Sequence, residues 1–331
     1  MRGMSLFVMA AVSGAFAAPV VAQSAQCAAQ FAALRDACQK GTDMFTMLMP
    51  QVQGAIAGGG PVLASARTSN SFSIGLRVNA VDGRLPDVGS VSLSTSGIVR
   101  SAIATSRAPV PAPALDIAFG VFPGVYVGMQ RVLSVEALVN VAYIPNRDVE
   151  SFSVRTTNGS LKLGYGARVG LLTDRMLMPA VSVSYFRRTL PTSTFSAAFA
   201  PSSATASSSD SLSLSELSIR NDALRLAVSK RLGALEIGGG VGQDRYRSFS
   251  VLQARVTPPV GLPVSGAFAL SQQIKRNAAY GSLGLNILRF RIGAEAGTTF
   301  GGDSISTFNT FTDGKLNERQ LFGSLGLRLN F

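Results

Sequence analysis

The sequence predicts an all-β protein, an antiparallel transmembrane β-barrel of ten to twelve strands preceded by a short N-terminal helical segment. Three observations support this fold class. Apolar residues occupy every second position through most of the chain after about residue 71. No later stretch contains the roughly 20 consecutive apolar residues of a transmembrane helix. Short and long polar links alternate between the apolar sets, which is the asymmetry of transmembrane barrels.

The composition agrees with strands that have one apolar face and one polar face. Of the 331 residues, 47% are hydrophobic and 15% are charged, and the mean hydropathy is +0.29. These values exclude a disordered chain. Because Ser, Thr, Asn, Arg and Gly interrupt the apolar residues every few positions, the hydrophobicity is spread in alternation and is not concentrated in spans.

Ten segments carry the alternation. In the first, Phe72, Ile74 and Leu76 are separated by polar or small residues. The predicted strands lie near residues 71–81, 113–130, 133–143, 159–172, 177–188, 212–229, 234–254, 267–287, 290–300 and 318–331. Because both termini of such a barrel lie on the same side of the membrane, the strand number is even. The alternation at Val91 and Leu93 belongs either to a loop or to an eleventh strand, which would require a twelfth.

The links between these segments differ in length. Short links are predicted at Gln130–Val132, Thr173–Arg175, Lys230–Gly233 and Leu288–Arg289, and long links at 82–112, 145–158, 189–211, 257–266 and 301–317. A soluble all-β domain would also alternate. We disfavour it because several strands reach about ten residues, which is longer than usual in soluble sheets, and because so many strands would enclose a large apolar cavity.

The N-terminal region precedes the alternation. Its first residues are typical of a secretory signal peptide, with Arg2 before an apolar stretch and a small-residue cleavage site ending at Ala22. Helix-forming residues follow, and we expect Gly41 to end a first helix and Asp43 to begin a second. The predicted divisions are a signal peptide over 1–22, a helical lead or plug segment over 23–60 and a barrel over 61–331.

Both cysteines, Cys27 and Cys38, lie in this lead segment. Export permits a disulfide bond between them. A continuous helix would hold their Cα atoms roughly 16 Å apart, which is too far for a disulfide. A bridge therefore requires the segment to bend, and the sequence leaves both arrangements open.

The absence of histidine limits the chemistry of the chain. It removes Ser-His-Asp and Cys-His catalysis and His-ligated zinc. The net charge of +12 is scattered without a basic cluster, which disfavours nucleic acid as a partner. We therefore expect no enzymatic activity, no cofactor and no metal, with basic residues facing a lumen or lipopolysaccharide.

The strand phase places a set of polar side chains inside the barrel. These candidate lumen-lining residues are Arg77, Asn79, Glu136, Asn140, Lys162, Arg168, Glu236, Arg291, Glu295 and Arg328. Such a mixed-charge lumen is either a sealed network of ion pairs or the lining of a narrow aqueous pore.

Inward glycines are the second feature of the predicted lumen. They are Gly164, Gly166 and Gly170 on one strand and Gly238, Gly240 and Gly242 on another. Glycine inside a strand marks close backbone approach or a bend. The set is either a smooth track on which the lead helices pack or a relief of curvature in a small barrel.

The chain resembles Gram-negative outer-membrane β-barrel proteins. The resemblance rests on the signal region, the alternating strands and the last strand, Leu325-Gly-Leu-Arg-Leu-Asn-Phe331. A final strand that ends in phenylalanine resembles the signal read by the barrel assembly machinery, so Phe331 is the candidate assembly signal. The resemblance implies export to the outer membrane, where lipid, lipopolysaccharide and that machinery are the expected partners.

A looser similarity is to the long-chain fatty-acid transporter group. It rests on a helical lead, with Pro50-Gln51 and Gly54-Ala-Ile-Ala-Gly58, that runs straight into the first strand. It implies a barrel with an N-terminal plug. The lead is also too short and polar to span a bilayer, so we expect residues 23–57 to lie in or against the lumen.

Two functions remain open from the sequence. The first is a channel or transporter for small or amphipathic solutes. The alternative is a closed structural or surface-interaction barrel without transport. The sequence identifies neither a substrate nor an oligomeric state.

Overall fold

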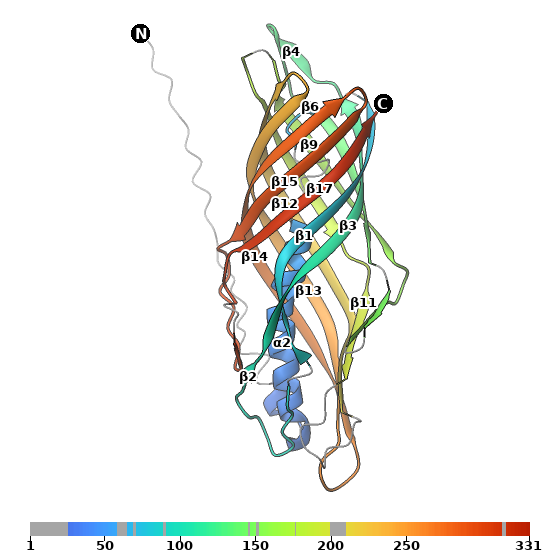
Figure 1. Cartoon of the computed structure of the whole chain (residues 1–331), viewed down its shortest axis with the longest axis vertical. Helices are drawn as coiled ribbons and strands as arrows, with labels where there is room; N and C mark the ends of the chain where they lie inside the picture. The colour runs from blue at the N-terminus through green and yellow to red at the C-terminus, as the bar shows by residue number, and fades with distance from the viewer. Residues whose placement is uncertain are drawn as a thin grey trace, which may run out of the picture.

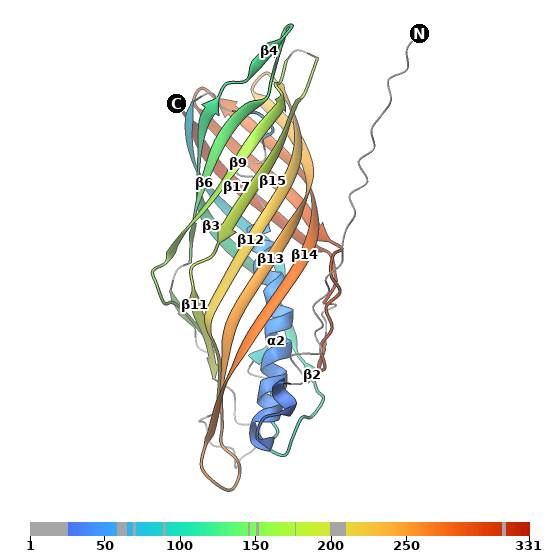
Figure 2. The ribbon, with the colours of Figure 1, turned by 180° about the vertical axis from the view of Figure 1, so that it is seen from behind.

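The computed structural model describes residues 26–57, 65–68, 71–88, 91–144, 146–149, 152–175, 177–198, 210–312 and 316–331. The predicted signal peptide lies outside these residues. In the described part of the chain, a single long helix is combined with a large antiparallel sheet (Figures 1 and 2).

Ten strands close into a barrel in the described residues. In order around the barrel they are β1 (Phe72–Pro86), β3 (Thr105–Phe122), β6 (Ser134–Tyr143), β9 (Leu161–Leu172), β10 (Ala180–Thr189), β12 (Ser211–Leu232), β13 (Leu235–Val256), β14 (Val264–Ile287), β15 (Phe290–Phe300) and β17 (Gln320–Asn330). The β10–β12 and β1–β17 pairings complete the circle. Closure gives the backbone groups of the strands partners without any contribution from lipid.

Further short strands accompany the ten barrel strands in the described residues. They are β2 (Ala102–Ile103), β4 (Val125–Val127), β5 (Gln130–Val132), β7 (Arg147–Val149), β8 (Phe152–Thr156), β11 (Ser193–Ala198) and β16 (Thr310–Phe311). β11 continues the sheet from β12, and β8 and β7 follow it. β2 and β16 form a separate parallel pair.

Burial follows the predicted period of two. Inward positions of β1 such as Arg77 and Asn79 are buried, whereas the neighbouring Leu76 and Val78 are exposed. The same pattern runs along the other barrel strands. Toward the turn end the outward residues are therefore apolar and the inward residues polar, which is the arrangement required of a barrel in a lipid bilayer. Toward the loop end the inward residues around α2, such as Leu252 and Phe268, are apolar, and Gln253 and Arg255 face outward.

The two ends of the barrel differ. The end with the short turns near Gly233 and Leu288 also holds Phe72 and Phe331, and we call it the turn end. The opposite end, the loop end, holds the long links 87–104, 144–160, 190–210, 257–263 and 301–319. In outer-membrane barrels short turns face the periplasm and long loops face the exterior.

The predicted loop over 82–112 is wrong at both of its ends. β1 continues to Pro86 and β3 begins at Thr105, with unbroken antiparallel pairing between them. This stretch contains alternating prolines, Pro109, Pro111 and Pro113. They are compatible with a strand because proline is tolerated where no ladder hydrogen bond is needed.

The predicted strand over 113–130 is also corrected. β3 ends at Phe122, and the small β4–β5 hairpin follows at the turn end. Gly124, with a φ of 93°, lies between them. A positive φ is easily adopted only by glycine, so this residue permits the chain to leave the barrel wall.

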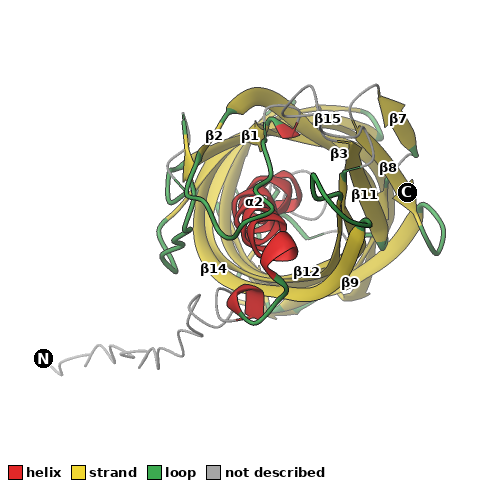
Figure 3. Ribbon diagram, turned by 90° about the horizontal axis from the view of Figure 1, so that it is seen from below, coloured by secondary structure: helices red, strands yellow, loops and turns green. Residues whose placement is uncertain are grey.

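Helix α2 (Ala32–Ala57) lies inside the ring of strands (Figure 3). It contacts β1, β3, β12, β13, β14 and β17. The expected break at Gly41 is wrong, because the helix is continuous through it. A Cβ at this position would lie 2.4 Å from Leu252 Cδ2, so Gly41 permits close packing on the wall. No described helix has the length and hydrophobicity needed to cross a membrane.

Candidate functional site

The described residues that precede β1 lie inside the lumen at several levels between the loop end and the turn end. The N-terminal half of α2 contacts the loops, and Gln53 near its C-terminus donates to Ser248 in the middle of β13. Further along, Ser65 donates to Glu236 and Thr68 hydrogen-bonds Ser134, both close to the turn end. Helix α2 and residues 65–68 therefore lie inside the barrel at successive levels between the loop end and the turn end.

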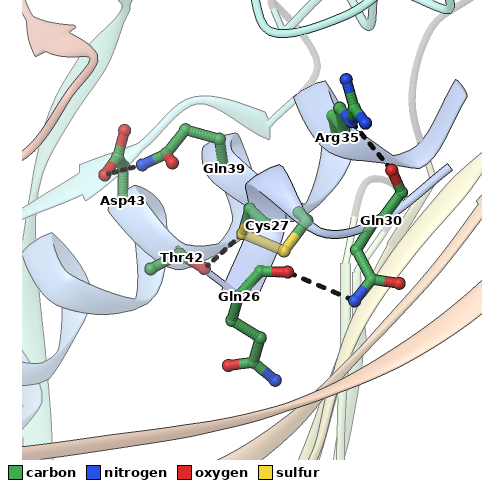
Figure 4. Close-up of a disulfide and its surroundings, with 8 residues drawn as sticks. Gln26, Cys27, Gln30, Arg35, Gln39, Thr42 and Asp43 are labelled. Carbon is green, nitrogen blue, oxygen red and sulfur yellow. Dashed lines mark hydrogen bonds between the residues drawn. A yellow bond between two sulfur atoms is a disulfide. The ribbon is translucent and has the colours of Figure 1, made fainter. Parts of the chain in front are cut away.

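A disulfide joins Cys27 and Cys38 at the loop end (Figure 4). The chain turns at residues 29–31 before α2 begins, which brings the two Cα atoms to 5.5 Å. Arg35 Nε donates to the carbonyl of Gln30 at 2.8 Å and holds this turn. The bend required for a disulfide is thus present, and the start of α2 is fastened to the segment before it.

Two acidic side chains of α2 hold the external loops over the barrel. Asp36 accepts hydrogen bonds from the backbone N–H groups of Ser94 and Val99, at 2.7 and 2.9 Å. Lys40 forms a salt bridge of 2.7 Å with Asp36 and donates to the carbonyl of Ser92. The link between β1 and β3 is therefore docked on the helix.

Asp43 holds the second loop, between β15 and β17. Its carboxylate accepts hydrogen bonds from the backbone and side-chain amides of Asn309, at 2.8 and 2.7 Å, and from the backbone of Phe308. Gln39 also donates to it. Burial raises the pKa of Asp43 from its ordinary value of 3.8, against the opposing effect of these hydrogen bonds. The predicted role of Asp43 as a helix N-cap is wrong, because it lies inside α2.

An apolar cavity of about 560 Å³ separates one side of α2 from the barrel wall. We call it the α2 cavity. The helix contributes Met44, Leu48 and Val52, and the wall contributes residues of β3, β6, β11 and β12, among them Ala142 and Leu212. Cavities of this size, lined mostly by apolar side chains, are typical of small-molecule sites.

The α2 cavity extends around the edge of β3. Its lining includes Val110 and Ala112, which share the inward phase, together with Pro109, Pro111 and Pro113, which share the outward phase. This part of β3 pairs with β1 on one side and, in the described residues, with no strand on the other. The cavity therefore reaches the outer surface of the wall.

The prolines explain how this edge is left open. Alternate residues of an antiparallel strand direct their N–H groups to the same neighbour. Gly120 donates its N–H toward the β1 side, to Ser71, so the odd-numbered prolines face away from β1. Proline has no N–H. Three donors that would otherwise lack a strand partner are thus removed from the edge.

Polar side chains form the inner floor of the cavity. Arg77 donates to both carboxylate oxygens of Asp116, at 2.6 and 3.2 Å, and Asn140 donates to the same carboxylate at 2.6 Å. Arg188 donates to the carbonyl of Ile56 at the C-terminal end of α2 and lies over the ring of Phe186. The floor therefore offers arginine and amide groups below apolar walls.

The structure places the candidate lumen residues as follows. Nine of the ten are buried, and the exception is Lys162, which is exposed because it follows the first residue of β9 at the loop end. Arg77 and Asn140 meet at the cavity floor, while Glu136 with Arg168 and Glu236 with Arg291 form ion pairs of 3.3 and 3.4 Å nearer the turn end. The set is thus divided between two layers.

The proposed packing of α2 on the inward glycines is wrong for most of them. A Cβ at Gly166, Gly240 or Gly242 would meet Phe186, Tyr280 or Arg225 of a neighbouring strand. Gly164 and Gly238 likewise lie against wall residues, and of the six only Gly170 faces the segment that precedes β1, at Thr68. These glycines make room for large inward side chains of adjacent strands.

Several important inward residues were missed. They are Asp116, Arg188, Arg225 and Asp244, of which Arg225 and Asp244 form a buried salt bridge of 2.6 Å. Asp116 lies between the apolar Leu115 and Ile117, so the strand phase alone could have identified it. Arg188 follows another arginine, and its phase could have been set from Val183 and Tyr185 in the same strand.

Comparison with known proteins gives fold-level similarities only. No family model and no curated protein matches the chain. Similar solved structures include Ail, the attachment invasion locus protein of Yersinia pestis, at 9% identity and a TM-score of 0.24 over 79% of this chain and 99% of that one. The monoaromatic hydrocarbon channel CymD has 10% identity and a TM-score of 0.30 over 85% and 97%. A FadL homologue of Pseudomonas aeruginosa has 10% and 0.24 over 84% and 97%.

The expectation that the chain is not an enzyme is corrected. The similar structures also include the outer-membrane protein OmpT of Vibrio cholerae, at 10% identity and a TM-score of 0.16 over 80% of this chain and 99% of that one. The missing histidine excludes histidine-dependent catalysis and not enzymes as a class.

The assignment of the fold rests on the structure itself. The sheet is closed, and toward the turn end its outward residues are apolar and exposed while its inward residues are polar and buried. The last residue, Phe331, joins the first strand through a backbone hydrogen bond to Phe72. These features identify the chain as an outer-membrane β-barrel protein.

Proposed function

We propose that the chain is an outer-membrane channel or transporter for small amphipathic solutes, which bind in the α2 cavity. The observation that carries this proposal is the cavity itself, about 560 Å³ of mostly apolar space between α2 and the barrel wall, above a floor of polar side chains. An amphipathic solute would gain the free energy of apolar burial along Met44 and Leu48. Its polar group would lie toward Arg77 and Asn140.

The edge of β3 supports a route for such a solute. The cavity is lined by both faces of this strand, so a solute dissolved in the outer membrane could enter at Pro109–Pro113 without crossing the docked loops. The same solute would then be held between α2 and the wall. Passage toward the turn end would require displacement of the lead segment from the lumen.

A closed barrel is the second candidate, and a specific observation favours it. Four ion pairs join inward side chains of different strands, and almost none of their side-chain surface is exposed. They are Arg77–Asp116, Arg168–Glu136, Arg225–Asp244 and Arg291–Glu236. Together with α2 they occupy much of the lumen. In this reading the protein presents its external loops to a partner and transports nothing.

The test is to fill the cavity without disturbing the barrel. Ala142 lines the α2 cavity and is buried, so Ala142→Phe places a ring inside it. The purified protein in nanodiscs is titrated with N-phenyl-1-naphthylamine, a small apolar fluorophore. We expect saturable binding to the wild type and a loss of at least about tenfold in affinity for A142F, since each factor of ten corresponds to about 1.4 kcal/mol.

The matched control is Ala167→Phe. Ala167 is exposed on the lipid-facing side of β9, so a ring there leaves the cavity unchanged. It should bind the fluorophore as the wild type does. Equal saturable binding to all three proteins, or none to the wild type, would refute the cavity as the binding site and favour the closed barrel.

A further inference from the structure

A second pocket opens at the turn end, and its lining is strongly basic. It has a volume of about 360 Å³, and five arginines and one carboxylate line it: Arg67, Arg131, Arg231, Arg291, Arg328 and Glu236. We call it the arginine pocket. It is far along the lumen from the α2 cavity, and no residue lines both.

The pocket deepens from an exposed rim to a buried floor. Arg231 is exposed at the rim, and Arg67 and Arg131 are half-buried. Arg291 and Arg328 at the floor are each only 4% exposed. Positive charge therefore continues from solvent at the turn end to a part of the lumen that water hardly reaches.

The two floor arginines lie directly opposite one another. Arg291 of β15 is the cross-strand partner of Arg328 of β17. Like charges in directly opposed positions destabilise a sheet, and burial strengthens their repulsion because the local dielectric is low. A barrel that keeps this pair requires negative charge close by.

The described residues provide only part of that charge. Glu236 forms an ion pair with Arg291 and accepts a hydrogen bond from Ser65 at 2.6 Å. Glu136, the next carboxylate, acts electrostatically on Arg328 and also forms an ion pair with Arg168, so these two carboxylates face more arginines than they can neutralise. The Nε atom of Arg328 is buried and has no hydrogen-bond partner among the described residues, and the same holds for Arg291 Nε.

We propose that the arginine pocket binds a phosphate group, held by Arg328 and Arg291 at the floor and by Arg67, Arg131 and Arg231 toward the rim. Guanidinium groups match the oxygens of phosphate in charge and geometry and bind them through paired hydrogen bonds. The several arginines favour a multiply charged anion over a monocarboxylate. This site is independent of solute binding in the α2 cavity.

The phosphate could belong to a soluble molecule in the periplasm or to the headgroup of a phospholipid. Both present the same chemistry to Arg328. The inward phase of the floor residues and the opening at the turn end suit a soluble phosphate, whereas a lipid headgroup would have to reach over the rim at Arg231. The experiment separates the two sources.

The test uses the full chain purified in a maltoside detergent, which contains no phosphate. Sodium pyrophosphate is titrated by calorimetry at constant ionic strength, with acetate as the monocarboxylate. We expect one saturable pyrophosphate site and much weaker acetate binding. Arg328→Met should weaken pyrophosphate binding about 10- to 100-fold, as expected for the loss of charged hydrogen bonds. Arg328→Lys should fall between the two.

The matched control is Arg276→Met. Arg276 is equally buried at 4% exposure but donates to loop carbonyls, including that of Leu316 at 3.3 Å. Its loss removes the same charge outside the pocket and should leave pyrophosphate affinity unchanged. Heat-modifiable migration on a gel verifies that each variant is folded. If R328M does not fold, the comparison of R328K with the wild type decides the matter.

Addition of phosphatidylglycerol to the micelles identifies the source. If phosphatidylglycerol competes with pyrophosphate in the wild type, the source is a lipid headgroup, and if it does not, the source is a soluble phosphate. Either result agrees with the proposal once R328M and R328K have lowered the affinity for pyrophosphate. Absence of saturable pyrophosphate binding, or an equal loss in R276M and R328M, overturns it.

Discussion

The side-chain amide of Gln272 on β14 donates a hydrogen bond of 3.3 Å to the backbone carbonyl of Thr46 on α2. In a regular helix that carbonyl accepts from the N–H of the residue four positions later. Here that residue is Pro50, which has no N–H. The barrel wall therefore supplies the donor that the helix lacks, and it does so at a partly buried position.

This hydrogen bond predicts that the effect of Gln272→Leu on the free energy of unfolding depends on whether position 50 is proline. Gln272→Leu should reduce the free energy of unfolding by about 1–3 kcal/mol, because it leaves the buried Thr46 carbonyl without a donor. Pro50→Ala restores the helical N–H, so the same Q272L change made in P50A should have a smaller effect. Urea unfolding in lipid vesicles, followed by gel mobility, measures both values. Equal losses in the two backgrounds would show that Gln272 does not replace the missing N–H.

The end of the chain should be required for closure of the barrel. Phe331 donates its N–H to the carbonyl of Phe72 at 2.9 Å, and the two rings lie 5.7 Å apart. Without Phe331 the seam between β1 and β17 loses its last contact at the turn end, and an open seam exposes strand edges that lipid cannot satisfy. We expect deletion of Phe331 to lower the folded fraction, measured as heat-modifiable protein in isolated outer membranes.

The control for this prediction is Phe290→Ala. Phe290 is another exposed aromatic residue at the turn end, at the start of β15. Its truncation removes a lipid-facing ring but keeps the seam, so the folded fraction should stay close to that of the wild type. A deletion of Phe331 that folded as well as F290A would count against a special role for the last residue.

The sequence was sufficient for the barrel because strand phase is a local property. The alternation of Leu76, Arg77 and Val78 indicates which side chains face lipid and which face the lumen. A one-residue shift in strand register would place the arginine in lipid. The ten predicted segments accordingly correspond to the ten strands that close the barrel in the described residues. The ends of β1 and β3 were missed because the apolar alternation stops there, and residues 82–112 were therefore predicted to be a long polar link.

The site could be predicted only in part, because it depends on which strands and loops meet. Phase indicated that Arg77 and Asn140 face inward, but their shared contact with Asp116 requires the β1–β3–β6 neighbourhood. The role of the glycines depended on partners across strands, such as Tyr280 beside Gly240. The disulfide depended on a turn at residues 29–31 that helix propensity does not reveal.

Removal of the lead helix should open the lumen. α2 lies inside the barrel and contacts six of its strands, whereas the strands pair with one another and not through the helix. Deletion of residues 26–57 should therefore leave a folded barrel with higher single-channel conductance in planar bilayers. The comparison protein is Cys27→Ser/Cys38→Ser, which lacks the disulfide but keeps the buried contacts of Asp36 and Asp43, and its conductance should remain near that of the wild type.

A truncated barrel that folds and conducts no better than the full chain would contradict this prediction. That result would mean that the ion pairs near the turn end, such as Arg168–Glu136, close the lumen without the helix. Substitution of this pair by Arg168→Gln/Glu136→Gln in the truncated protein would then be expected to raise the conductance.

Docking of the loop between β15 and β17 should depend on pH through Asp43. Burial raises the pKa of this carboxyl above its ordinary value of 3.8, so the docked state binds the proton more tightly than the undocked state. Protonation of Asp43 therefore adds to the stability of the docked state. This contribution is complete below the ordinary pKa of the carboxyl and is lost as pH rises through its raised pKa in the docked state. Acidification should therefore strengthen docking of Phe308 and Asn309 on α2.

Hydrogen exchange of the peptide that covers residues 305–312, corrected for the intrinsic exchange rate at each pH, measures this effect. In the wild type, protection should increase as pH falls toward 4. Asp43→Asn keeps a neutral acceptor for the Asn309 amide but cannot titrate, so its protection should not change with pH over the same range. A pH dependence of the same size in D43N would assign the effect to another group, and protection in the wild type that decreases on acidification would show that the hydrogen bonds to the charged carboxylate outweigh its burial.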